Sequence, residues 1–303
     1  AGFVEELVSR GFAQRFGSCS GRPVELERLV APGGPGPGPP GGVSLHPVRG
    51  GVNLRMPLEI VPDIVAVRRA IAGAGRVWVE VGCNNWELLR DDLLRPGNED
   101  VFLISVEPLP DKWAFLRAQS IPGRQLVLPL AVSSTPTPYA ILRSQNYSDF
   151  RDVPGRKFQE SGASSLLGYA DHFTDHMWQG ARKQYQSMRE LVVPTVSLGW
   201  ILDTFVVNRA VDWLKVDAQG LDFDVVMAAG SRVSDLRVVS LELHEHTRYA
   251  SEPRCSEVVS HMGELGFRVR SATNKGGHPG SGSVCSVFDP AAHDEWDVEF
   301  EMR

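Results

Sequence analysis

The sequence lacks several features that mark particular classes of protein. Of its 303 residues, 31 are basic and 37 acidic, so no excess of positive charge predicts a broad nucleic-acid surface. No apolar run approaches the ~20 residues of a membrane-spanning helix. The chain opens without a signal peptide and does not begin with Met. We therefore expect a soluble protein, either of the cytoplasm or of an organelle that has removed a targeting segment.

Cysteine is also scarce. The 4 cysteines are too few and too scattered for a disulfide framework, and no Cys-x-x-Cys pair suggests a structural zinc site. Cys255 and Cys285 could meet in space, but we expect free thiols in a reducing compartment. No Gly-x-Gly-x-x-Gly follows the first predicted strand, which argues against a dinucleotide-dependent dehydrogenase.

Glycine and proline, in contrast, are abundant and concentrated. Residues 32–42 consist only of these two types, and neither a helix nor a strand can persist there. Before this linker, apolar residues at spacings of four and five predict a short amphipathic helix. After it, residues 57–72 predict a helix that leads into the main domain. We predict an N-terminal arm and linker over 1–55 and one large domain over 56–303.

From residue 76 onward, short apolar runs alternate with segments of helical spacing, which is typical of βαβ units. We predict an α/β, Rossmann-like doubly wound fold, whose mostly parallel sheet of about seven strands carries helices on both faces. The predicted strands are 77–82, 101–107, 126–132, 211–217, 238–244, 267–271 and 283–288, the last one antiparallel at the sheet edge. The predicted helices are 86–94, 111–119, 221–229 and 255–265.

The polar segment 143–190 interrupts this alternation. It contains four glycines, two histidines, a tryptophan and three tyrosines among mostly polar residues. Two interpretations stay open: an insertion that caps the sheet, or a lid over a substrate pocket.

Three predicted strands end in residues that could serve a cofactor, because doubly wound sheets bind ligands beyond the carboxyl ends of their strands. The first ends in Glu80-Val81-Gly82-Cys83-Asn84, and the second in Val106-Glu107-Pro108. An acid such as Glu107 can accept hydrogen bonds from both hydroxyls of a ribose. Residues 215–222 read KVDAQGLD, and GASSLL occurs at 162–167. Taken together over residues 76–250, these motifs resemble the FkbM-type S-adenosylmethionine-dependent methyltransferases.

The resemblance implies a domain that binds S-adenosylmethionine and methylates a hydroxyl of a small molecule or a glycan. Lys215 and Asp217 would then face the transferring methyl group or the acceptor. The residues expected to contact the cofactor are Glu80, Gly82, Cys83 and Asn84 on its methionine side, Glu107 at the ribose, and Ala131, Val132 and Ser133 near the adenine.

Methyl transfer from a sulfonium requires little more than in-line placement and a base for the hydroxyl proton. Asp217, at a strand end, is one candidate base. His244 ends the next strand and is a second, because its ordinary pKa suits proton transfer. A metal held by His244, Glu245 and His246 is disfavoured, since neighbouring residues on a strand alternate faces. We therefore predict no metal site.

Two positions depart from the family pattern. Trp86 stands where a small residue is expected after the first strand, and Gln219 replaces a glutamate before Gly220. These departures support an alternative hypothesis, a catalytically inactive methyltransferase-like subunit that serves a larger assembly. In that case residues 1–42 would bind a protein partner.

Overall fold

The structure is a computed structural model that describes residues 63–84, 88–135, 137–144, 164–170, 189–274, 284–285 and 295–303. From Ile64 onward the described residues belong to one unit. The predicted N-terminal helix and the linker at 32–42, the first part of the helix predicted at 57–72, Trp86 and most of the segment 143–190 lie outside the described residues. The predicted division at residue 55 therefore stays a prediction.

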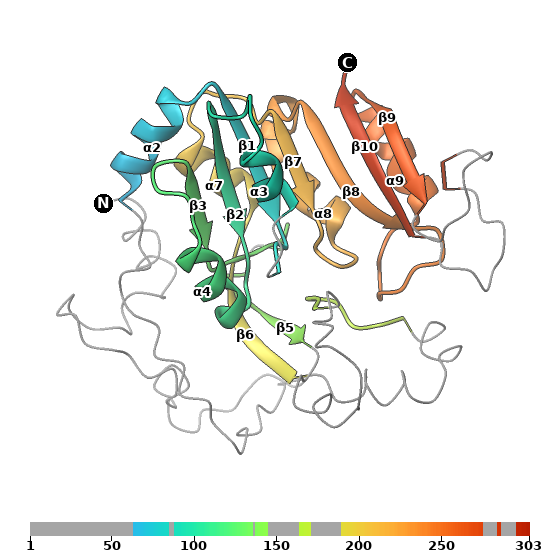
Figure 1. The fold of residues 1–303 in the computed structure, drawn as a ribbon. Coiled ribbons are helices and arrows are strands. Elements are labelled where there is room, and N and C mark those ends of the chain that lie inside the picture. The colour runs from blue at the N-terminus through green and yellow to red at the C-terminus, as the bar shows by residue number, and fades with distance from the viewer. Residues whose placement is uncertain are drawn as a thin grey trace, which may run out of the picture. The chain divides into compact units, whose positions relative to one another are not determined.

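The central element is a seven-stranded sheet with the strand order β3-β2-β1-β7-β8-β10-β9 (Figure 1). The first five strands run parallel to their neighbours, and β10 pairs antiparallel with both β8 and β9. The strands are β1 (Arg76–Val81), β2 (Val101–Val106), β3 (Gln125–Leu128), β7 (Trp213–Val216), β8 (Val238–His244), β9 (Phe267–Asn274) and β10 (Glu295–Met302). This confirms the predicted doubly wound, mostly parallel sheet.

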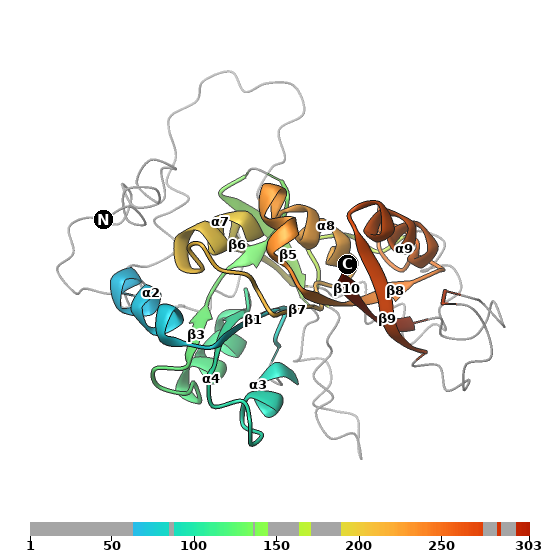
Figure 2. The same cartoon turned by 90° about the horizontal axis from the view of Figure 1, so that it is seen from above.

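Helices cover both faces of this sheet. Figure 2 shows α3 and α4 on one face, and α7, α8 and α9 on the other. The helices are α2 (Ile64–Gly73), α3 (Leu88–Leu93), α4 (Pro110–Ala118), α7 (Leu198–Phe205), α8 (Asp222–Met227) and α9 (Cys255–Glu264), and a 3₁₀ turn, η4, spans Gly230–Asp235. The helices predicted at 86–94, 111–119, 221–229 and 255–265 are confirmed as α3, α4, α8 and α9.

The sequence of β1 explains why both faces are covered. Its apolar residues are buried on both sides of the sheet, as in parallel sheets generally. Val77 and Val79 belong to the larger core cluster, which includes Ile201 of α7. Trp78 points the other way and packs in a second cluster with Leu89 of α3. Side chains that alternate along one strand thus bind two helical layers to the sheet.

Two predicted strands differ in the structure. The segment 126–132 forms two strands, because Pro129 has no N–H for a continuous ladder. Its second part, β4 (Ala131–Val132), joins a three-stranded sheet with β6 (Arg189–Val196) and β5 (Tyr139–Ser144), in the order β4-β6-β5. This second sheet was not predicted. Figure 1 shows β5 and β6 beyond the carboxyl ends of the main sheet.

The prediction of an antiparallel edge strand at 283–288 is wrong in position. Val284 and Cys285 form a turn, and the other four residues lie outside the described part of the chain. The antiparallel strand is β10, which lies inside the sheet between β8 and β9. Its alternation of buried Trp296, Val298 and Phe300 with polar residues is the period-two pattern of a strand.

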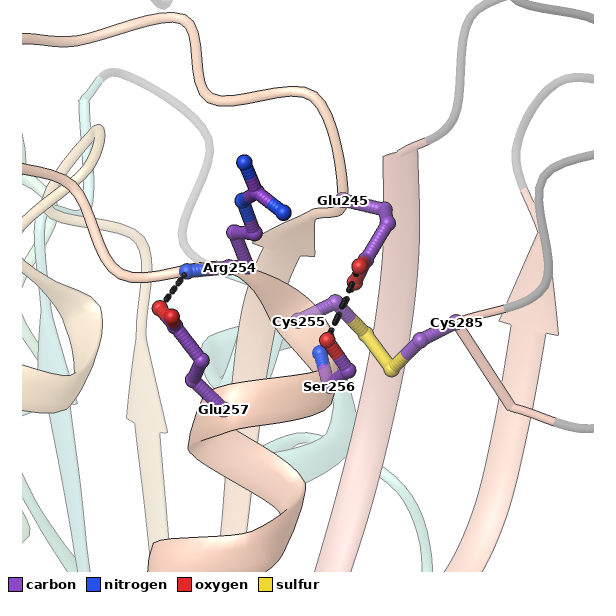
Figure 3. Close-up of a disulfide and its surroundings, with 6 residues drawn as sticks. All are labelled: Glu245, Arg254, Cys255, Ser256, Glu257 and Cys285. Carbon is purple, nitrogen blue, oxygen red and sulfur yellow. Dashed lines mark hydrogen bonds between the residues drawn. A yellow bond between two sulfur atoms is a disulfide. The ribbon is translucent and has the colours of Figure 1, made fainter.

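The expectation of free thiols is wrong for two of the cysteines. Cys255, the first residue of α9, forms a disulfide with Cys285, at a Cα–Cα distance of 5.5 Å (Figure 3). Both residues are buried. Cys83 is buried and is not part of a disulfide. In the described part of the chain, no helix is long and apolar enough to cross a membrane.

Candidate cofactor and methyl-transfer site

The site begins where the strand order reverses. β1 lies between β2 and β7, so the connections that leave β1 and β7 diverge, and this switch point is where doubly wound sheets bind ligands. Gly82 follows β1 and Asp217 follows β7, and the N–H of Asp217 donates to the carbonyl of Val81 at 2.9 Å. Gly82 has φ +80°, and a Cβ there would lie 1.9 Å from the carbonyl oxygen of Asp217. Only glycine allows the two strand ends to approach so closely.

A pocket opens at this point, with roughly 690 Å³ of space that atoms do not fill, part of it open to solvent. Among the predicted cofactor and catalytic residues, those on its lining are Gly82, Asn84, Glu107, Ala131, Val132 and Asp217. The other lining residues are Val81, Pro108, Leu109, Leu130, Leu142, Ser164, Leu166, Ala218 and Leu221.

Glu107 is the buried acid of this pocket. Its Oε1 accepts a hydrogen bond from the N–H of Leu109 at 2.8 Å, and its Oε2 accepts one from the N–H of Asn84 at 2.7 Å. Burial raises the pKa of Glu107 to about 7, although the two backbone N–H groups oppose that shift. Each carboxylate oxygen can still accept a further bond, because a carboxylate offers about four lone-pair sites.

Three of the predicted cofactor residues lie behind the pocket lining. The Glu80 carboxylate accepts hydrogen bonds from the N–H groups of Leu88 (2.9 Å) and Leu89 (3.0 Å), so it fixes the start of α3. The thiol of Cys83 lies near the carbonyls of Glu80 and Val106, at 3.4 and 3.5 Å. The Ser133 hydroxyl donates to Asp224 at 3.4 Å. These side chains shape the turns around the pocket.

Lys215 and Asp217 form an ion pair at the end of β7. Lys215 Nζ lies 3.6 Å from Asp217 Oδ2 and 3.9 Å from Glu80 Oε1. Burial alone would lower the pKa of Lys215, but the carboxylates of Asp217 and Glu80 outweigh it, and the pKa is raised. Lys215 therefore stays an ammonium ion. The Asp217 side chain is 30% exposed and reaches the pocket lining, whereas Lys215 does not.

Gln219 connects this ion pair with β8. Its Nε2 donates to Asp217 Oδ1 at 2.7 Å and to Glu242 Oε1 at 3.2 Å. Its Oε1 accepts a bond from the Tyr249 hydroxyl at 2.6 Å. A neutral amide can donate to two carboxylates, whereas the glutamate of the family pattern would add a third negative charge. A glutamine in place of the family's glutamate therefore suits the two carboxylates beside it.

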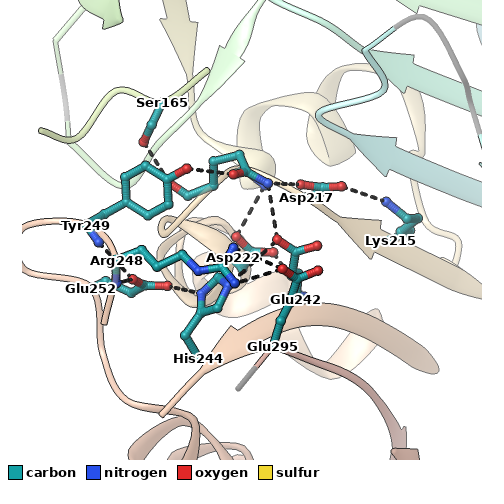
Figure 4. A network of polar contacts seen from close by, with 12 residues as sticks. Ser165, Lys215, Asp217, Asp222, Glu242, His244, Arg248, Tyr249, Glu252 and Glu295 are labelled. Atoms are coloured by element: carbon teal, nitrogen blue, oxygen red, sulfur yellow. Dashed lines mark hydrogen bonds and ion pairs between the residues drawn. The ribbon is translucent and has the colours of Figure 1, made fainter. Parts of the chain in front are cut away.

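His244 ends β8 in a buried polar network (Figure 4) and is 1% exposed. Its Nδ1 lies 2.7 Å from Glu252 Oε1. Its Nε2 lies 3.8 Å from a Glu295 oxygen and 4.0 Å from a Glu242 oxygen. Burial lowers the pKa of His244, but Glu252 and Glu295 raise it more, to about 9. The structure does not bring His244 to the pocket lining.

Sequence reasoning missed several residues of this region. Leu142 and Ser164 reach the pocket from parts of the chain whose position depends on the unpredicted second sheet. Tyr249, Glu252 and Glu295 belong to the polar network, and no local motif marks them. For Glu295 one signal existed: the alternating residues of β10 predict a strand, although not its neighbour. Glu245, a metal candidate that the sequence disfavoured, accepts hydrogen bonds from Ser256 at the start of α9 (Figure 3).

A doubly wound sheet with a buried acid after β2 and a glycine turn after β1 is typical of proteins that bind a nucleoside-containing cofactor at the switch point. The chain matches the methyltransferase FkbM domain over residues 81–269, more than half of its length. It belongs to this family of methyltransferases, and its cofactor is S-adenosylmethionine.

Solved structures with a similar fold are remote in sequence. The methyltransferase FkbM from Methylobacillus flagellatus KT is 10% identical, with a TM-score of 0.38, over 76% of this chain and 44% of its own. Magnesium protoporphyrin IX methyltransferase (ChlM) from Synechocystis PCC 6803, with bound SAM, is 8% identical, with a TM-score of 0.34, over 79% of each chain. M. capricolum TrmK, in complex with S-adenosyl-homocysteine, is 6% identical, with a TM-score of 0.33, over 80% of this chain and 70% of its own. No curated protein matches the chain.

The residues present fit S-adenosylmethionine. Glu107 has a buried carboxyl group with free acceptor capacity on the pocket lining, and two ribose hydroxyls would use it. Leu109, Leu130 and Val132 supply apolar surface on the same lining, as the flat face of an adenine requires. Both groups of residues follow adjacent strands of the main sheet.

Proposed function

We propose that this protein transfers a methyl group from S-adenosylmethionine to a hydroxyl of a small molecule or glycan, with Asp217 as the base. One observation carries the proposal. Glu107 and Asp217 line the same pocket from adjacent parts of the switch point, one buried and the other 30% exposed. A carboxylate that contacts solvent beside the cofactor can accept a proton from an incoming hydroxyl.

When bound, S-adenosylmethionine supplies a methyl group on a positively charged sulfur. In the transfer, a bond forms between the acceptor oxygen and the methyl carbon while the carbon–sulfur bond breaks. The hydroxyl proton passes to an oxygen of Asp217. Lys215 and Gln219 hold that carboxylate in position through its two oxygens. The contribution of the chain is therefore placement and proton acceptance.

Asp217 is a better candidate for the base than Lys215 or His244. Lys215 is an ammonium ion, because its pKa is raised, and it has no proton-accepting lone pair. His244 is 1% exposed, and its Nδ1 is hydrogen-bonded to Glu252. His244 is also not on the lining of the pocket, so an acceptor held there would not contact it. We assign His244 to the network behind the pocket and not to proton transfer.

The competing hypothesis of an inactive subunit rested largely on Gln219 and Trp86. Gln219 makes three side-chain hydrogen bonds that a glutamate could not make in the same way, so this departure is no sign of a decaying site. Binding of a protein partner through residues 1–42 stays a separate proposal, since those residues lie outside the described part of the chain.

The test combines cofactor binding with transfer. Calorimetry with S-adenosyl-homocysteine measures binding, and mass spectrometry of small alcohols and glycans incubated with enzyme and cofactor detects a gain of one methyl group. Asp217→Asn should keep cofactor affinity within about twofold and lower the transfer rate at least 100-fold, a typical effect of losing a base. Asp203→Asn is the matched control, because Asp203 is exposed and bound to Arg232 away from the pocket.

Each outcome separates the hypotheses. Cofactor binding without transfer to any acceptor, in the wild-type protein, would favour the inactive subunit. Transfer that survives in Asp217→Asn would remove Asp217 from the role of base. If the control Asp203→Asn also lost cofactor binding, the effect of Asp217→Asn would reflect a change in folding and not the loss of a base.

A further inference from the structure

Three side chains with metal-binding groups meet on one face of the main sheet. Glu242 and His244 are two residues apart on β8 and therefore point to the same side. Glu295, at the start of β10, is the direct cross-strand partner of His244. One atom from each, two carboxylate oxygens and an imidazole nitrogen, lies within 4.8 Å of the other two. Figure 4 shows the two carboxylates beside the imidazole ring.

The two ring nitrogens of His244 have different surroundings, because Nδ1 contacts Glu252 at hydrogen-bond distance and Nε2 faces Glu242 and Glu295 at longer range. Nδ1 lies 2.7 Å from Glu252 Oε1, and Glu252 is itself held by the N–H groups of Arg248 (2.6 Å) and Tyr249 (3.0 Å). Nε2 is buried and has no hydrogen-bond partner among the residues that the structure describes. A buried nitrogen without such a partner is costly, so its occurrence beside two carboxylates requires an explanation.

This arrangement is the one that proteins use to orient a metal-binding histidine. A carboxylate on one ring nitrogen fixes the ring plane, and the other nitrogen then faces the ion. Because the carboxylates raise the pKa of His244 to about 9, Nε2 carries a proton until an ion binds there, and the ion replaces that proton, which is released. Glu252 has the position of that orienting carboxylate. Glu242 and Glu295 lie where the remaining protein ligands would be needed.

The distances are close to those of a binding site. Nε2 lies 4.0 Å from Glu242 Oε1 and 3.8 Å from Glu295 Oε2. Ligands around a tetrahedral ion lie about 3.4 Å apart, given metal–ligand bonds of about 2.1 Å. A shift of a few tenths of an ångström therefore brings Nε2 and each carboxylate oxygen to this separation, and the two carboxylate oxygens lie within 4.8 Å of each other.

The charge around the three residues favours a cation. Glu242, Glu252 and Glu295 surround His244, and their carboxylate oxygens lie 4.0, 2.7 and 3.8 Å from its ring nitrogens. Opposite them, the guanidinium of Arg248 lies 2.9 Å from Glu295 Oε2. Carboxylates thus outnumber cationic groups around His244, in a part of the sheet shielded from water.

We propose that Glu242, His244 and Glu295 bind one divalent transition-metal ion, Zn²⁺ or Mn²⁺, at the end of β8. One imidazole with two carboxylates suits these ions better than Mg²⁺ or Ca²⁺, which prefer oxygen ligands alone. The ion links β8 to β10. The ion lies beside Glu242, and the Gln219 amide connects Glu242 to Asp217. Lys215 contacts Asp217 at the other end of this chain of polar residues.

The experiment uses the full chain with its disulfide intact, so that the thiols of Cys255 and Cys285 do not bind metal. After treatment with a chelator and removal of the chelator, the protein is titrated with ZnCl₂ and separately with MnCl₂. Calorimetry measures binding, and electron paramagnetic resonance counts bound Mn²⁺. We expect one ion per chain that is lost on mutation, and a rise in melting temperature when it binds.

Variants locate the ion. Glu295→Gln should weaken it at least tenfold by removing a ligand, and Glu252→Gln should weaken it about 10- to 100-fold by releasing the ring. Glu299→Gln is the matched control on the same strand, where Glu299 accepts a bond from Ser271. Circular dichroism shows whether each variant is folded.

Two results would overturn the proposal: no binding of either ion by the wild-type protein, or binding that is equal in wild-type, Glu295→Gln and Glu252→Gln. Binding of S-adenosyl-homocysteine is measured in parallel and should be unchanged in Glu295→Gln. Failure of the metal site is thus distinguished from failure of the methyltransferase function.

Discussion

Gly82 lies so close to Asp217 that a single added carbon atom on Gly82 would lie 1.9 Å from the Asp217 carbonyl oxygen. The contact joins the turn after β1 to the turn after β7, and both residues line the candidate cofactor pocket. Because the opposing atom belongs to the backbone, no side-chain movement can relieve a clash there. The pocket therefore depends on this glycine.

The first prediction concerns Gly82→Ala. It should destabilise the protein by about 3 kcal/mol or more, through overpacking and a left-handed backbone conformation that alanine disfavours. Urea unfolding measures the loss, and calorimetry should show that S-adenosyl-homocysteine no longer binds. Gly97→Ala is the control, because Gly97 also has a positive φ of +91° but no atom within 4 Å of an added Cβ. If both variants lose the same unfolding free energy, the left-handed backbone conformation alone explains the loss, and the close contact with Asp217 does not contribute.

The second prediction concerns the pH dependence caused by Glu107, whose pKa is about 7 in the folded protein and 4.5 ordinarily. Between these values the folded protein holds a proton that the unfolded chain has released, so stability falls as pH rises through this range. The free energy of unfolding of wild-type minus that of Glu107→Gln should therefore fall by about 3 kcal/mol from pH 4.5 to pH 7.5.

Urea unfolding of both proteins at a series of pH values checks this difference. All other titrating groups are the same in the two proteins, so their contributions to the unfolding free energy cancel in the subtraction. Saturating S-adenosyl-homocysteine should reduce the slope, because ribose hydroxyls that donate to Glu107 favour its charged form. A difference that is flat across this pH range would contradict the raised pKa.

The third prediction concerns Gln219→Glu, which restores the residue of the family pattern. A third carboxylate would then lie within hydrogen-bond distance of Asp217 and Glu242, where the amide now donates to both. We expect a loss of about 2 kcal/mol in the free energy of unfolding at pH 8. Gln119→Glu, at the exposed end of α4, should change it by less than about 0.5 kcal/mol. Equal stability of wild-type and Gln219→Glu would show that the hydrogen bonds from the Gln219 amide to Asp217 and Glu242 do not stabilise the fold.

The fourth prediction concerns the disulfide between Cys255 and Cys285, which are 30 residues apart. Closing a loop of this length is expected to stabilise the fold by about 3–4 kcal/mol, on the chain-entropy account. Double replacement by alanine should lower the free energy of unfolding by that amount. A reducing agent should destabilise the wild-type protein and leave the double variant unchanged. A wild-type protein that is insensitive to reduction would contradict a stabilising bond.

The main sheet could be predicted because its signals are local. Runs such as residues 101–106 are apolar except for Ser105, and segments of helical spacing follow them, so the order of strands and helices can be read along the chain. Strand ends were also predictable, and with them the position of Gly82, Glu107 and Asp217 on one pocket, whereas their roles there stay predictions. In a doubly wound sheet, the chemistry lies at those ends whatever the surrounding loops do.

The tertiary structure alone decided which distant residues meet. Glu295 lies opposite His244 only because β10 inserts between β8 and β9, a choice of neighbour that depends on packing across the whole sheet. The bond between Cys255 and Cys285 and the position of Tyr249 over Gln219 have the same origin. Local periodicity determines what each segment is. Long-range burial, which no window of sequence contains, determines what it touches.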